Sequence, residues 1–330
     1  MSYPCKDKKK QMITQKETDE KYMRRCIQLA LNGRANAKPN PMVGAVLVAG
    51  GRIIGEGYHV RCGEGHAEVN CFASVAPHDE PLVPRATLYV SLEPCSHYGK
   101  TPPCADLIVR KGVHRVVCGC IDPFGKVQGR GVEKLRQAGI DVTVGVLEAE
   151  CKELNSRFFT FNTRQRPYIL LKWAQSADGF LDDHGRAFAF SSAYTRMLVH
   201  KLRSEYDAIL VGRVTNEREH PGLDVRLWSG PSPERMVLST TAAGAEWQSS
   251  TQGVLAHLYE EKKQSLMVEG GARTLQSFIS AGLWDELRVE TAPVCTGGGT
   301  PAPSLPASAT VRSRAEYDGR TIITYAPAAR

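Results

Sequence analysis

The sequence predicts two consecutive α/β domains, the first of them a three-layer α/β sandwich. The chain has 330 residues, more than one hydrophobic core usually holds, so two domains of roughly 150 residues each are expected. Apolar residues make up 42% of the chain and charged residues 23%, which are ordinary values for globular domains. In both halves short apolar runs alternate with amphipathic helical segments. This alternation is typical of βαβ crossovers in a largely parallel sheet that helices cover on both faces.

The first half shows this alternation segment by segment. An amphipathic helix is predicted for "TDEKYMRRCIQLALNG", with Thr18 or Asp19 as its cap and residues 1–17 as a flexible tail before it. Two extended runs then flank Gly50-Gly51, which is a hairpin signal. A helix begins near His66. The remaining predicted elements are strand 86–94, helix 105–112, strand 115–123, helix 131–139 and strand 141–146.

The second half restarts the same pattern after a linking helix. We place the first domain at residues 1–147, the linking helix at 148–166 and the second domain at 167–330, with Pro167 at the junction. The elements predicted for the second domain are an extended run 168–179, helix 191–206, strand 207–212, an extended run 265–271, helix 272–282, strand 284–294 and a final strand pair around 321–327. A Gly- and Pro-rich loop, "TGGGTPAPSLPASAT", precedes that pair.

Charge and cysteine content narrow the class of protein. The formal charge of +7 is spread over both halves, so it fits a phosphate-bearing small substrate as well as a nucleic acid, and the run Lys8 to Lys10 is interpreted as a solvated tail. No apolar stretch follows those lysines and no run approaches the length of a membrane span, so we expect a cytoplasmic protein with no membrane partner. Ten cysteines in a reducing compartment favour metal binding or catalysis for a few of them over disulfides.

One stretch of the chain concentrates metal-binding side chains. Residues two apart on a helix point about 200° away from each other, so His66 and Glu68 can face one ligand only at the first turn. Cys95 follows Pro94 after a strand, which is typical of a helix start that lowers the pKa of a thiol. One His and two Cys thiolates, here with Cys104, leave a position of tetrahedral zinc open for water. We therefore assign the His and the two Cys as zinc ligands and the Glu as the residue that moves a proton to a departing amine.

Two other interpretations of this cluster remain open. The thiols pack in a core, or Cys62, His97 or His59 supplies a fourth protein ligand and closes a structural zinc site. A structural site has no use for a carboxyl group at the zinc-facing end of the helix. The presence of Glu68 therefore favours the catalytic interpretation.

The cysteine spacing departs from the P-C-x-x-C of zinc deaminases, because "SHYGKTPP" separates Cys95 from Cys104. In this respect Glu93 to Cys104 resembles the deaminase half of a bifunctional riboflavin-pathway family, diaminohydroxyphosphoribosylaminopyrimidine deaminase joined to 5-amino-6-(5-phosphoribosylamino)uracil reductase. The segments "PNPMVGAVLV", "GEGYH", "HAEV" and "VQGRGVEKLRQAGI" are similar to the family pattern in the same order. The resemblance covers essentially the whole first domain and implies a cytidine-deaminase-like fold. It also implies that Asn40, His59 and Lys100 contact the pyrimidine and its ribose phosphate.

The second half is similar to the reductase half of the same family, which has a dihydrofolate-reductase-like fold and uses NADPH. The similarity rests on "PYILLKWAQSADG", "KLRSEYDAILVGRVT" and "SLMVEGGARTLQSFI". In the last of these, two glycines between a strand and a helix let the backbone approach a ligand while the helix N-terminus faces phosphate. The resemblance implies that NADPH lies along Ala174, Thr215, Glu219, Gly270 and Gly271, and that substrate faces Arg203, Leu223, Arg226 and Glu269.

The two arginines among these residues suit a sugar phosphate, because a guanidinium can bind phosphate through two parallel hydrogen bonds. The alternative to phosphate binding is that Arg203 lies solvated on a helix face and that Arg226 lies on the surface. The chain also departs from the family. "EREHPGL" places Glu219 and His220 where an acidic pair or Asp-Asn is common, and we expect Glu219 to do the same job with a longer reach. "GRAFAFSS" lacks the Ser and Trp of a G-x-S-x-W run.

The resemblance predicts a bifunctional enzyme with one zinc ion per chain and NADPH as cofactors. The first reaction is zinc-dependent hydrolytic deamination of 2,5-diamino-6-ribosylamino-4(3H)-pyrimidinone 5′-phosphate, and the second is reduction of the ribosyl group to ribityl. We expect a phosphorylated ribosylaminopyrimidine as substrate, no nucleic-acid partner, and a homodimer or larger oligomer.

Two rival functions stay open. The departures in the second half allow a deaminase whose reductase-like domain binds nucleotide or precursor without turnover. A nucleic-acid or nucleoside deaminase with an accessory domain would need a basic, aromatic-lined groove, and the sequence shows no such interleaving.

Overall fold

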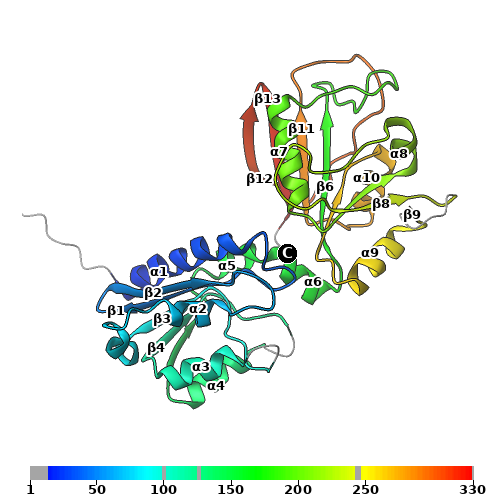
Figure 1. The fold of residues 1–330 in the computed structure, drawn as a ribbon. Helices are drawn as coiled ribbons and strands as arrows, with labels where there is room; N and C mark the ends of the chain where they lie inside the picture. The colour runs from blue at the N-terminus through cyan, green and yellow to red at the C-terminus, as the bar shows by residue number, and fades with distance from the viewer. Residues whose placement is uncertain (1–13, 99–101, 125–127, 242–246, 329–330) are drawn as a thin grey trace, which may run out of the picture. The chain divides into compact units, whose positions relative to one another are not determined.

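The computed structural model describes residues 14–98, 102–124, 128–241 and 247–328. The chain divides into two compact units, which meet in the sequence between Asn155 and Ser156 (Figure 1). Each unit is built around one sheet, and each is described here by itself. Among the described residues, no helix is both long enough and apolar enough to cross a bilayer.

The first unit holds a five-stranded mixed sheet with the strand order β2-β1-β3-β4-β5. Its strands are β1 (Gly44–Ala49), β2 (Arg52–Tyr58), β3 (Thr87–Val90), β4 (Arg115–Cys118) and β5 (Asp141–Val144). The predicted hairpin around Gly50-Gly51 forms, and both glycines adopt the positive φ of its turn. The prediction of a largely parallel sheet was wrong for this unit. β1 runs antiparallel to β2 and to β3, and only β3, β4 and β5 are parallel.

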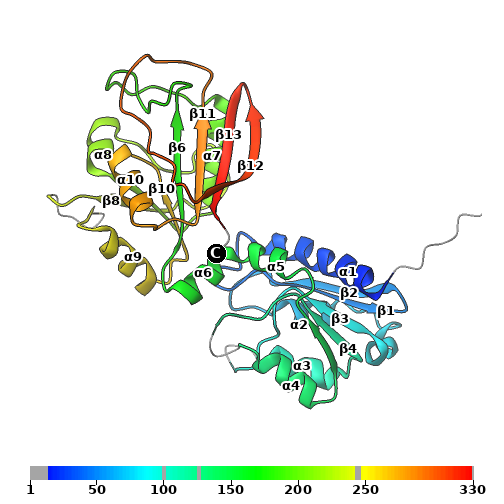
Figure 2. The same cartoon turned by 180° about the vertical axis from the view of Figure 1, so that it is seen from behind.

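Helices cover both faces of this sheet and make three layers (Figures 1 and 2). The helices are α1 (Gln15–Ala30), α2 (Ala67–Ala73), α3 (Cys104–Lys111), α4 (Arg130–Gln137) and α5 (Glu148–Leu154), with 3-10 turns at Leu31–Gly33 and Glu80–Arg85. Successive strand residues point to opposite faces. Leu47 and Leu88 share one core with α2, α3 and α4, whereas the ring of Tyr89 meets Tyr22 of α1 on the other face. The sandwich therefore places α2 and α3, which carry the candidate zinc ligands, on the same side.

Helix α1 begins earlier than predicted. Its cap is Thr14, not Thr18 or Asp19, and residues 15–17 of the predicted tail are helical. Thr14 Oγ1 accepts the N–H of Glu17 at 3.2 Å, and the Glu17 carboxylate accepts the N–H of Thr14 at 2.8 Å, so the two residues form a capping box. Residues 1–13 lie outside the described residues. Asp19 instead faces the sheet, where it pairs with Arg115 of β4.

The single linking helix predicted at 148–166 is two helices, α5 and α6 (Ser156–Arg164). Asn155 separates them with a φ of −114°, which is outside the helical range. Its side chain accepts the N–H of Met42 and donates to the carbonyl of Met42, both at 2.8 Å. Asn155 thus gives up helical geometry for two hydrogen bonds to the main chain that precedes β1.

The second unit holds an eight-stranded sheet with the order β12-β13-β11-β6-β10-β7-β8-β9. Its strands are β6 (Tyr168–Gln175), β7 (Ala208–Gly212), β8 (Glu234–Leu238), β9 (Trp247–Gln248), β10 (Ser265–Val268), β11 (Glu286–Thr291), β12 (Ala309–Tyr317) and β13 (Arg320–Pro327). The six strands from β11 to β9 are parallel to their neighbours, and β13 is antiparallel to both β11 and β12. The final strand pair predicted from the sequence is therefore confirmed.

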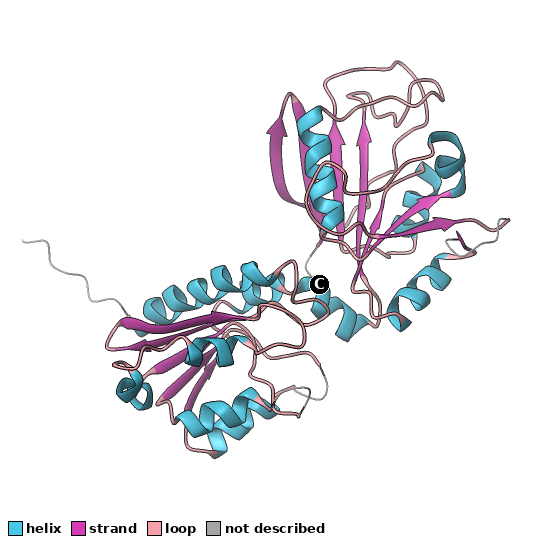
Figure 3. Ribbon diagram, viewed as in Figure 1, coloured by secondary structure: helices cyan, strands magenta, loops and turns pink. Residues whose placement is uncertain are grey.

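Helix α7 packs on one face of this sheet, and α9 and α10 pack on the other (Figure 3). The helices of this unit after α6 are α7 (Ala193–Ser204), α8 (Arg213–Glu219), α9 (Thr251–Glu260) and α10 (Ala272–Ser280). The sequence interpretation missed α8, α9, β8 and β9. Helix α8 follows β7 directly, and α10 follows β10 after a three-residue turn, residues 269–271. Both begin at the carboxyl edge of the parallel strands, which is where α/β sheets bind ligands.

Candidate active sites

Three metal-binding side chains converge in the first unit. His66 is the N-cap of α2 and has an extended backbone (φ −70°, ψ 170°), while Glu68 is the second residue of the helix. The two side chains therefore share the helix start, as their spacing requires. Cys104 is the first residue of α3. Cys95 lies in the loop after β3 and does not begin a helix, which corrects the prediction. The helix start that affects it is that of α3, because the N–H of Cys104 donates to Cys95 Sγ at 3.3 Å.

The geometry of this cluster fits zinc. His66 Nδ1 lies 3.5 Å from Cys95 Sγ and 3.3 Å from Cys104 Sγ. One ligand atom from each of the three residues lies within 4.8 Å of the others. Nitrogen and thiolate ligands at about 2.1 and 2.3 Å from a tetrahedral ion would lie about 3.6 Å apart, close to these separations. Within the described residues no fourth His, Cys or carboxylate joins the cluster, so the site keeps an open position.

The two thiols of the cluster differ in how readily they ionise. The pKa of Cys95 falls to about 4, because the Cys104 thiol, His66 and the Cys104 main chain all stabilise its thiolate. The neighbouring Cys95 thiolate and burial raise the pKa of Cys104. A divalent cation between the two sulfurs would offset the burial of Cys104 and its repulsion from the Cys95 thiolate, and so favour a second thiolate. The cluster therefore holds one thiolate readily and needs a cation to hold two.

Glu68 lies beside this cluster and is only 3% exposed. Burial and the nearby Cys95 thiolate raise its pKa to about 7, although His66 acts in the opposite direction. A carboxyl group with a pKa near neutrality can both accept and return a proton. Gly57 of β2 helps to place it, because a Cβ at Gly57 would lie 2.3 Å from the nitrogen of Cys71 in α2. Only glycine lets the strand approach the helix so closely.

Two of the predicted substrate contacts lie together beside the cluster. The ring of His59 is 2% exposed and meets the ring of His66 edge to face, with centroids 5.3 Å apart. His59 Nδ1 is 3.2 Å from the carbonyl of Gly65, and its Nε2 is 3.1 Å from Asn40 Nδ2. Burial lowers the pKa of His59, which favours a neutral ring that donates from Nδ1 and accepts at Nε2. The ring thus orients the Asn40 amide. Lys100, the third predicted contact, lies outside the described residues.

The sequence interpretation missed one supporting residue, Glu93. Its side chain is buried two residues before Cys95. The carboxylate accepts the main-chain N–H groups of Asp122, Gly129, Gly131 and Val132 at 2.9 to 3.2 Å. Four donors satisfy both carboxylate oxygens, so Glu93 caps α4 and holds the loop that carries the cysteine. An acidic residue in an apolar strand end, as in "SLEP", was the available signal.

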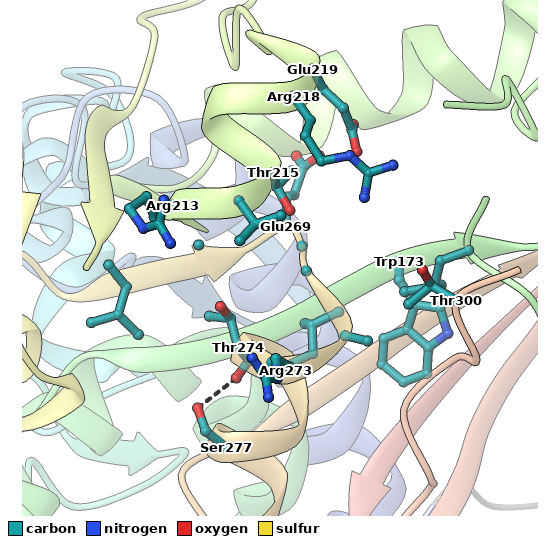
Figure 4. Close-up of a pocket in the computed structure, with 18 of the residues that line it drawn as sticks. Trp173, Arg213, Thr215, Arg218, Glu219, Glu269, Arg273, Thr274, Ser277 and Thr300 are labelled. Carbon is teal, nitrogen blue, oxygen red and sulfur yellow. Dashed lines mark hydrogen bonds between the residues drawn. The ribbon is translucent and has the colours of Figure 1, made fainter. Parts of the chain in front are cut away.

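The second unit contains a cavity of about 760 Å³ at the carboxyl ends of β6, β10, β7 and β8 (Figure 4). This volume is in the range of small-molecule and cofactor sites. The lining includes the predicted Ala174, Thr215, Glu219, Glu269, Gly270 and Gly271. It also includes residues that the sequence interpretation did not select, among them Lys172, Trp173, Asp182, Arg213, Arg218, Ser239, Thr240, Arg273, Thr274 and Thr300. A lysine inside the apolar strand "YILLKWAQ" was a signal for the first of these.

The glycines of this cavity fit a cofactor that approaches the main chain. Gly271 has a φ of +67°, which side chains rarely adopt, and a Cβ there would lie 3.1 Å from Thr215 Oγ1. A Cβ on Gly212 would lie 2.4 Å from Thr274 Oγ1. Glycine at these positions keeps the starts of α8 and α10 close together and leaves their backbones open to a ligand. Together with the cationic lining, this cradle suits the phosphates of NADPH.

A buried charge network closes the cavity on one side. Arg203 Nε and Nη2 donate to the two carboxylate oxygens of Glu269 at 2.8 and 2.9 Å, and Lys172 Nζ lies 3.7 Å from the same carboxylate. Burial acts to raise the pKa of Glu269, but the charges of Lys172 and Arg203 outweigh it and hold the pKa below its ordinary value. Burial lowers the pKa of Lys172. The alternative of a solvated Arg203 was therefore wrong, because this guanidinium is buried against Glu269.

Three predicted substrate contacts, Arg203, Leu223 and Arg226, do not line the cavity. Leu223 is buried in the core under α7, with Ile209 and Val211. The side chain of Arg226 is 59% exposed and pairs with Asp224 at 2.7 Å. Asp224 in turn is linked to the network, because its carbonyl accepts a hydrogen bond from Arg203 at 3.2 Å. The segment that carries Leu223 and Arg226 thus adjoins the back of the charge network.

Comparisons with known proteins agree with both sites. Residues 16–120 match the cytidine and deoxycytidylate deaminase zinc-binding region, and residues 167–316 match the RibD C-terminal domain. The chain is 39% identical over 322 residues to the riboflavin biosynthesis protein RibD of Aquifex aeolicus, which covers 86% of this chain and 89% of that protein. It is 35% identical to RibD of Escherichia coli over 330 residues, covering 84% and 89%.

A solved structure extends the likeness to the fold. It is a diaminohydroxyphosphoribosylaminopyrimidine deaminase/5-amino-6-(5-phosphoribosylamino)uracil reductase from Thermotoga maritima, with a TM-score of 0.84 and 34% identity. The superposition covers 95% of this chain and all of that one. Fold and sites together define a bifunctional enzyme, in which a cytidine-deaminase-like zinc domain is followed by a dihydrofolate-reductase-like domain. The chain belongs to the RibD family of riboflavin biosynthesis proteins. The family resemblance seen in the sequence is thereby confirmed.

Proposed function

We propose that this enzyme catalyses two consecutive steps of riboflavin biosynthesis at the two sites described above. The first unit deaminates 2,5-diamino-6-ribosylamino-4(3H)-pyrimidinone 5′-phosphate, and the second reduces the ribosyl group of the product to ribityl with NADPH. The observation that carries this proposal is the cluster of His66, Cys95 and Cys104 with Glu68 beside it, in a chain that also holds the glycine-lined cavity. No observation favours a reductase-like domain without turnover.

The deaminase assignments follow from the geometry of the first site. We assign His66, Cys95 and Cys104 as the zinc ligands, and bound zinc would supply an activated water molecule at neutral pH. Glu68 accepts a proton from that water and returns it to the amine that leaves the pyrimidine. Asn40 Oδ1 accepts no hydrogen bond from the described residues, so it is available to an N–H of the pyrimidine. His59 holds that amide in place, and Lys100 remains a predicted contact to the substrate.

The reductase assignments follow from the second site. Bound NADPH would supply the hydride for the sugar carbon that is bonded to the amine, and the ring oxygen would take up a proton as the ribose ring opens. We assign Ala174, Thr215, Glu219, Gly270 and Gly271 to the cofactor. Glu269 lies where Lys172 and Arg203 converge, so it holds its charge and orients the lysine ammonium toward the cavity. Leu223 and Arg226 remain predicted substrate contacts.

The experiment that tests this proposal separates the two steps. The deaminated ribosylaminouracil phosphate is added to purified protein with NADPH, and absorbance at the NADPH band is followed. We expect NADPH to be consumed. Ammonia is measured separately with the diaminopyrimidine substrate and no NADPH. Ammonia release without NADPH consumption would contradict the reductase assignment and leave a deaminase with a binding domain.

Three further properties remain predictions. The two reduced thiols of the first site suit a cytoplasmic enzyme. Reaction with a small phosphorylated substrate requires no nucleic acid. We also expect a homo-oligomer, a dimer or larger, and sedimentation of the purified protein would check this.

A further inference from the structure

Arg288 is a buried cation in the middle of β11 that has no partner of its own. The residue is 9% exposed, and its Nη1 is buried without a hydrogen-bond partner. Among the residues that the structure describes, its side chain also forms no ion pair. Burial lowers the pKa of Arg288, although the carboxylates of Glu290 and Glu269 act in the opposite direction. An unpaired buried charge lowers the stability of a fold, so the reductase unit keeps Arg288 at a cost.

Arg288 lies beside a lysine of the cavity wall. In the parallel pairing of β11 with β6, Arg288 is opposite Lys172. Paired residues point to the same face of a sheet, and neighbouring strands are about 4.8 Å apart. Lys172 lines the cavity, whereas Arg288 does not. Two side chains of like charge thus lie next to each other on one face of the sheet, and only one of them belongs to the cavity wall.

Charged side chains face the Lys172 ammonium from three elements. The carboxylate of Glu269, directly after β10, lies 3.7 Å from Lys172 Nζ. Arg203 of α7 donates two hydrogen bonds to that same carboxylate. Arg288 and Glu290 face the ammonium from β11. The buried network around Glu269 therefore contains three cations and two carboxylates.

Neither of the two carboxylates forms an ion pair with Arg288. Glu290 is fully buried, and its two oxygens accept hydrogen bonds from Ser191 Oγ at 3.0 Å and from Thr195 Oγ1 at 2.6 Å. Both hydroxyl groups belong to the start of α7. Glu269 already accepts the two hydrogen bonds described above. Arg288 is therefore the cation of this network that acts on its neighbours only through its charge.

This charge has a direction with respect to Lys172. The strand order is β11-β6-β10, so Lys172 of β6 lies between Arg288 on one side and Glu269 on the other. The carboxylate attracts the ammonium and the guanidinium repels it, and both effects move it away from β11. Burial lowers the pKa of Lys172, Glu269 raises it, and Arg288 lowers it further. The repulsion that costs stability thus also sets where the ammonium lies.

We propose that Arg288 is a positioning residue of the reductase, which directs the Lys172 ammonium away from β11 and into the cavity, where it meets the ribosylaminopyrimidine substrate. This inference rests on the proposed reductase function. In it the arginine contacts neither substrate nor cofactor and acts through the lysine alone. Without Arg288, the ammonium is free to turn toward Glu290 and is lost to the substrate.

The test compares three variants in the NADPH consumption assay with the deaminated ribosylaminouracil phosphate. Arg288→Met removes the charge and keeps a long side chain, and Arg288→Lys keeps the charge. Arg314→Met removes an exposed arginine of β12 and is the matched control. We expect Arg288→Met to raise KM for the substrate about tenfold, as for the loss of one charge-assisted contact, and to leave KM for NADPH within about twofold. Arg288→Lys should stay close to the wild type, and the control should be unchanged.

Two further readouts distinguish positioning from support of the fold. Removal of the repulsion raises the pKa of Lys172, so the alkaline limb of the pH profile of kcat/KM should move to higher pH in Arg288→Met. The melting temperature of this variant should equal or exceed that of the wild type, because an apolar side chain replaces an unpaired buried charge. An arginine that only supports the fold would give a lower melting temperature and no shift of the alkaline limb.

The outcomes separate this inference from the function on which it rests. A wild type that consumes no NADPH overturns the reductase assignment and this inference with it. An active wild type beside an Arg288→Met variant with the same KM and the same pH profile overturns this inference alone. A lower melting temperature together with a higher KM for both substrate and NADPH would assign Arg288 to the fold and also overturn it.

Discussion

Glu93 accepts the main-chain N–H of Gly131 at 2.9 Å, so a buried carboxylate at the end of β3 is fixed to the first turn of α4. A Cβ on Gly131 would lie 1.9 Å from the carbonyl oxygen of Pro94, which shows how closely the two segments pack. Because Cys95 follows Pro94 directly, this contact also sets the position of a candidate zinc ligand. The chemistry of the first site thus depends on a residue that does not contact the metal.

Replacing Glu93 by Gln should destabilise the deaminase unit. The Gln amide nitrogen is a donor, and it would face main-chain N–H groups that are donors as well. We expect a loss of about 1–3 kcal/mol in the free energy of unfolding, as for a buried donor left without an acceptor, and a lower zinc content after dialysis. Denaturant melts and metal analysis would measure both. Glu133→Gln, an exposed change on α4, is the matched control, and equal stability of the two variants would contradict this role.

Replacing Glu68 by Gln should abolish ammonia release and leave zinc bound. The amide cannot accept a proton from water, and general acid–base catalysis is worth about 10²- to 10⁴-fold in rate. The ligand atoms of His66, Cys95 and Cys104 are unchanged, so one zinc ion per chain should remain. The rate is measured with the diaminopyrimidine substrate and the metal by atomic absorption. Retained ammonia release would contradict the proton-transfer role.

Replacing Arg203 by Met should destabilise the reductase unit and reduce NADPH consumption. The change removes both hydrogen bonds that the buried Glu269 carboxylate accepts from Arg203 and leaves Lys172 3.7 Å away. Removal of one partner of a buried ion pair costs about 3–5 kcal/mol. Urea unfolding of purified Arg203→Met would measure this loss, with Arg196→Met as the matched control. Arg196 is exposed on the same helix, so its change should cost less than about 0.5 kcal/mol.

The pair of Asp19 and Arg115 should make stability depend on acid pH. Burial acts to raise the pKa of Asp19, but the hydrogen bonds from Arg115 and two other donors outweigh it and hold the pKa below 3.8. A pKa that folding lowers gives stability that is complete above the unfolded value and lost as pH falls through the folded value. The unfolding free energy of wild type minus Asp19→Asn should therefore be constant from pH 7 to about pH 5 and shrink below pH 4. A difference that stays constant down to pH 3 would contradict this.

Local motifs made the first site predictable. His66 and Glu68 are two residues apart at a helix start, and Cys95 and Cys104 flank one loop, so short-range geometry brings them together. The contacts of residues outside these motifs could not be predicted from the sequence. Neither the four donors of Glu93 nor the partner of Arg203 can be deduced from spacing, because each contact joins segments that are distant in the sequence.

In the fold, too, local features could be predicted from the sequence and long-range pairing could not. Strand and helix types followed the hydrophobic pattern, but the order and direction of strands depend on which segments pair. The hairpin signal at Gly50-Gly51 accounts for the antiparallel pairing of β1 with β2, but nothing in the apolar run "GAVLVA" specifies that β3 pairs antiparallel on the other side.

The two hydrogen bonds between Asn155 and Met42 have a consequence for synthesis on the ribosome. They join residues 113 positions apart, at the end of the first unit. The main chain of Met42 can form these hydrogen bonds only after residue 155 has been made and has left the exit tunnel. The deaminase unit therefore completes its native contacts late, when translation of the reductase unit is already under way. The first half of the chain folds as a domain, but its final step overlaps in time with the appearance of the second.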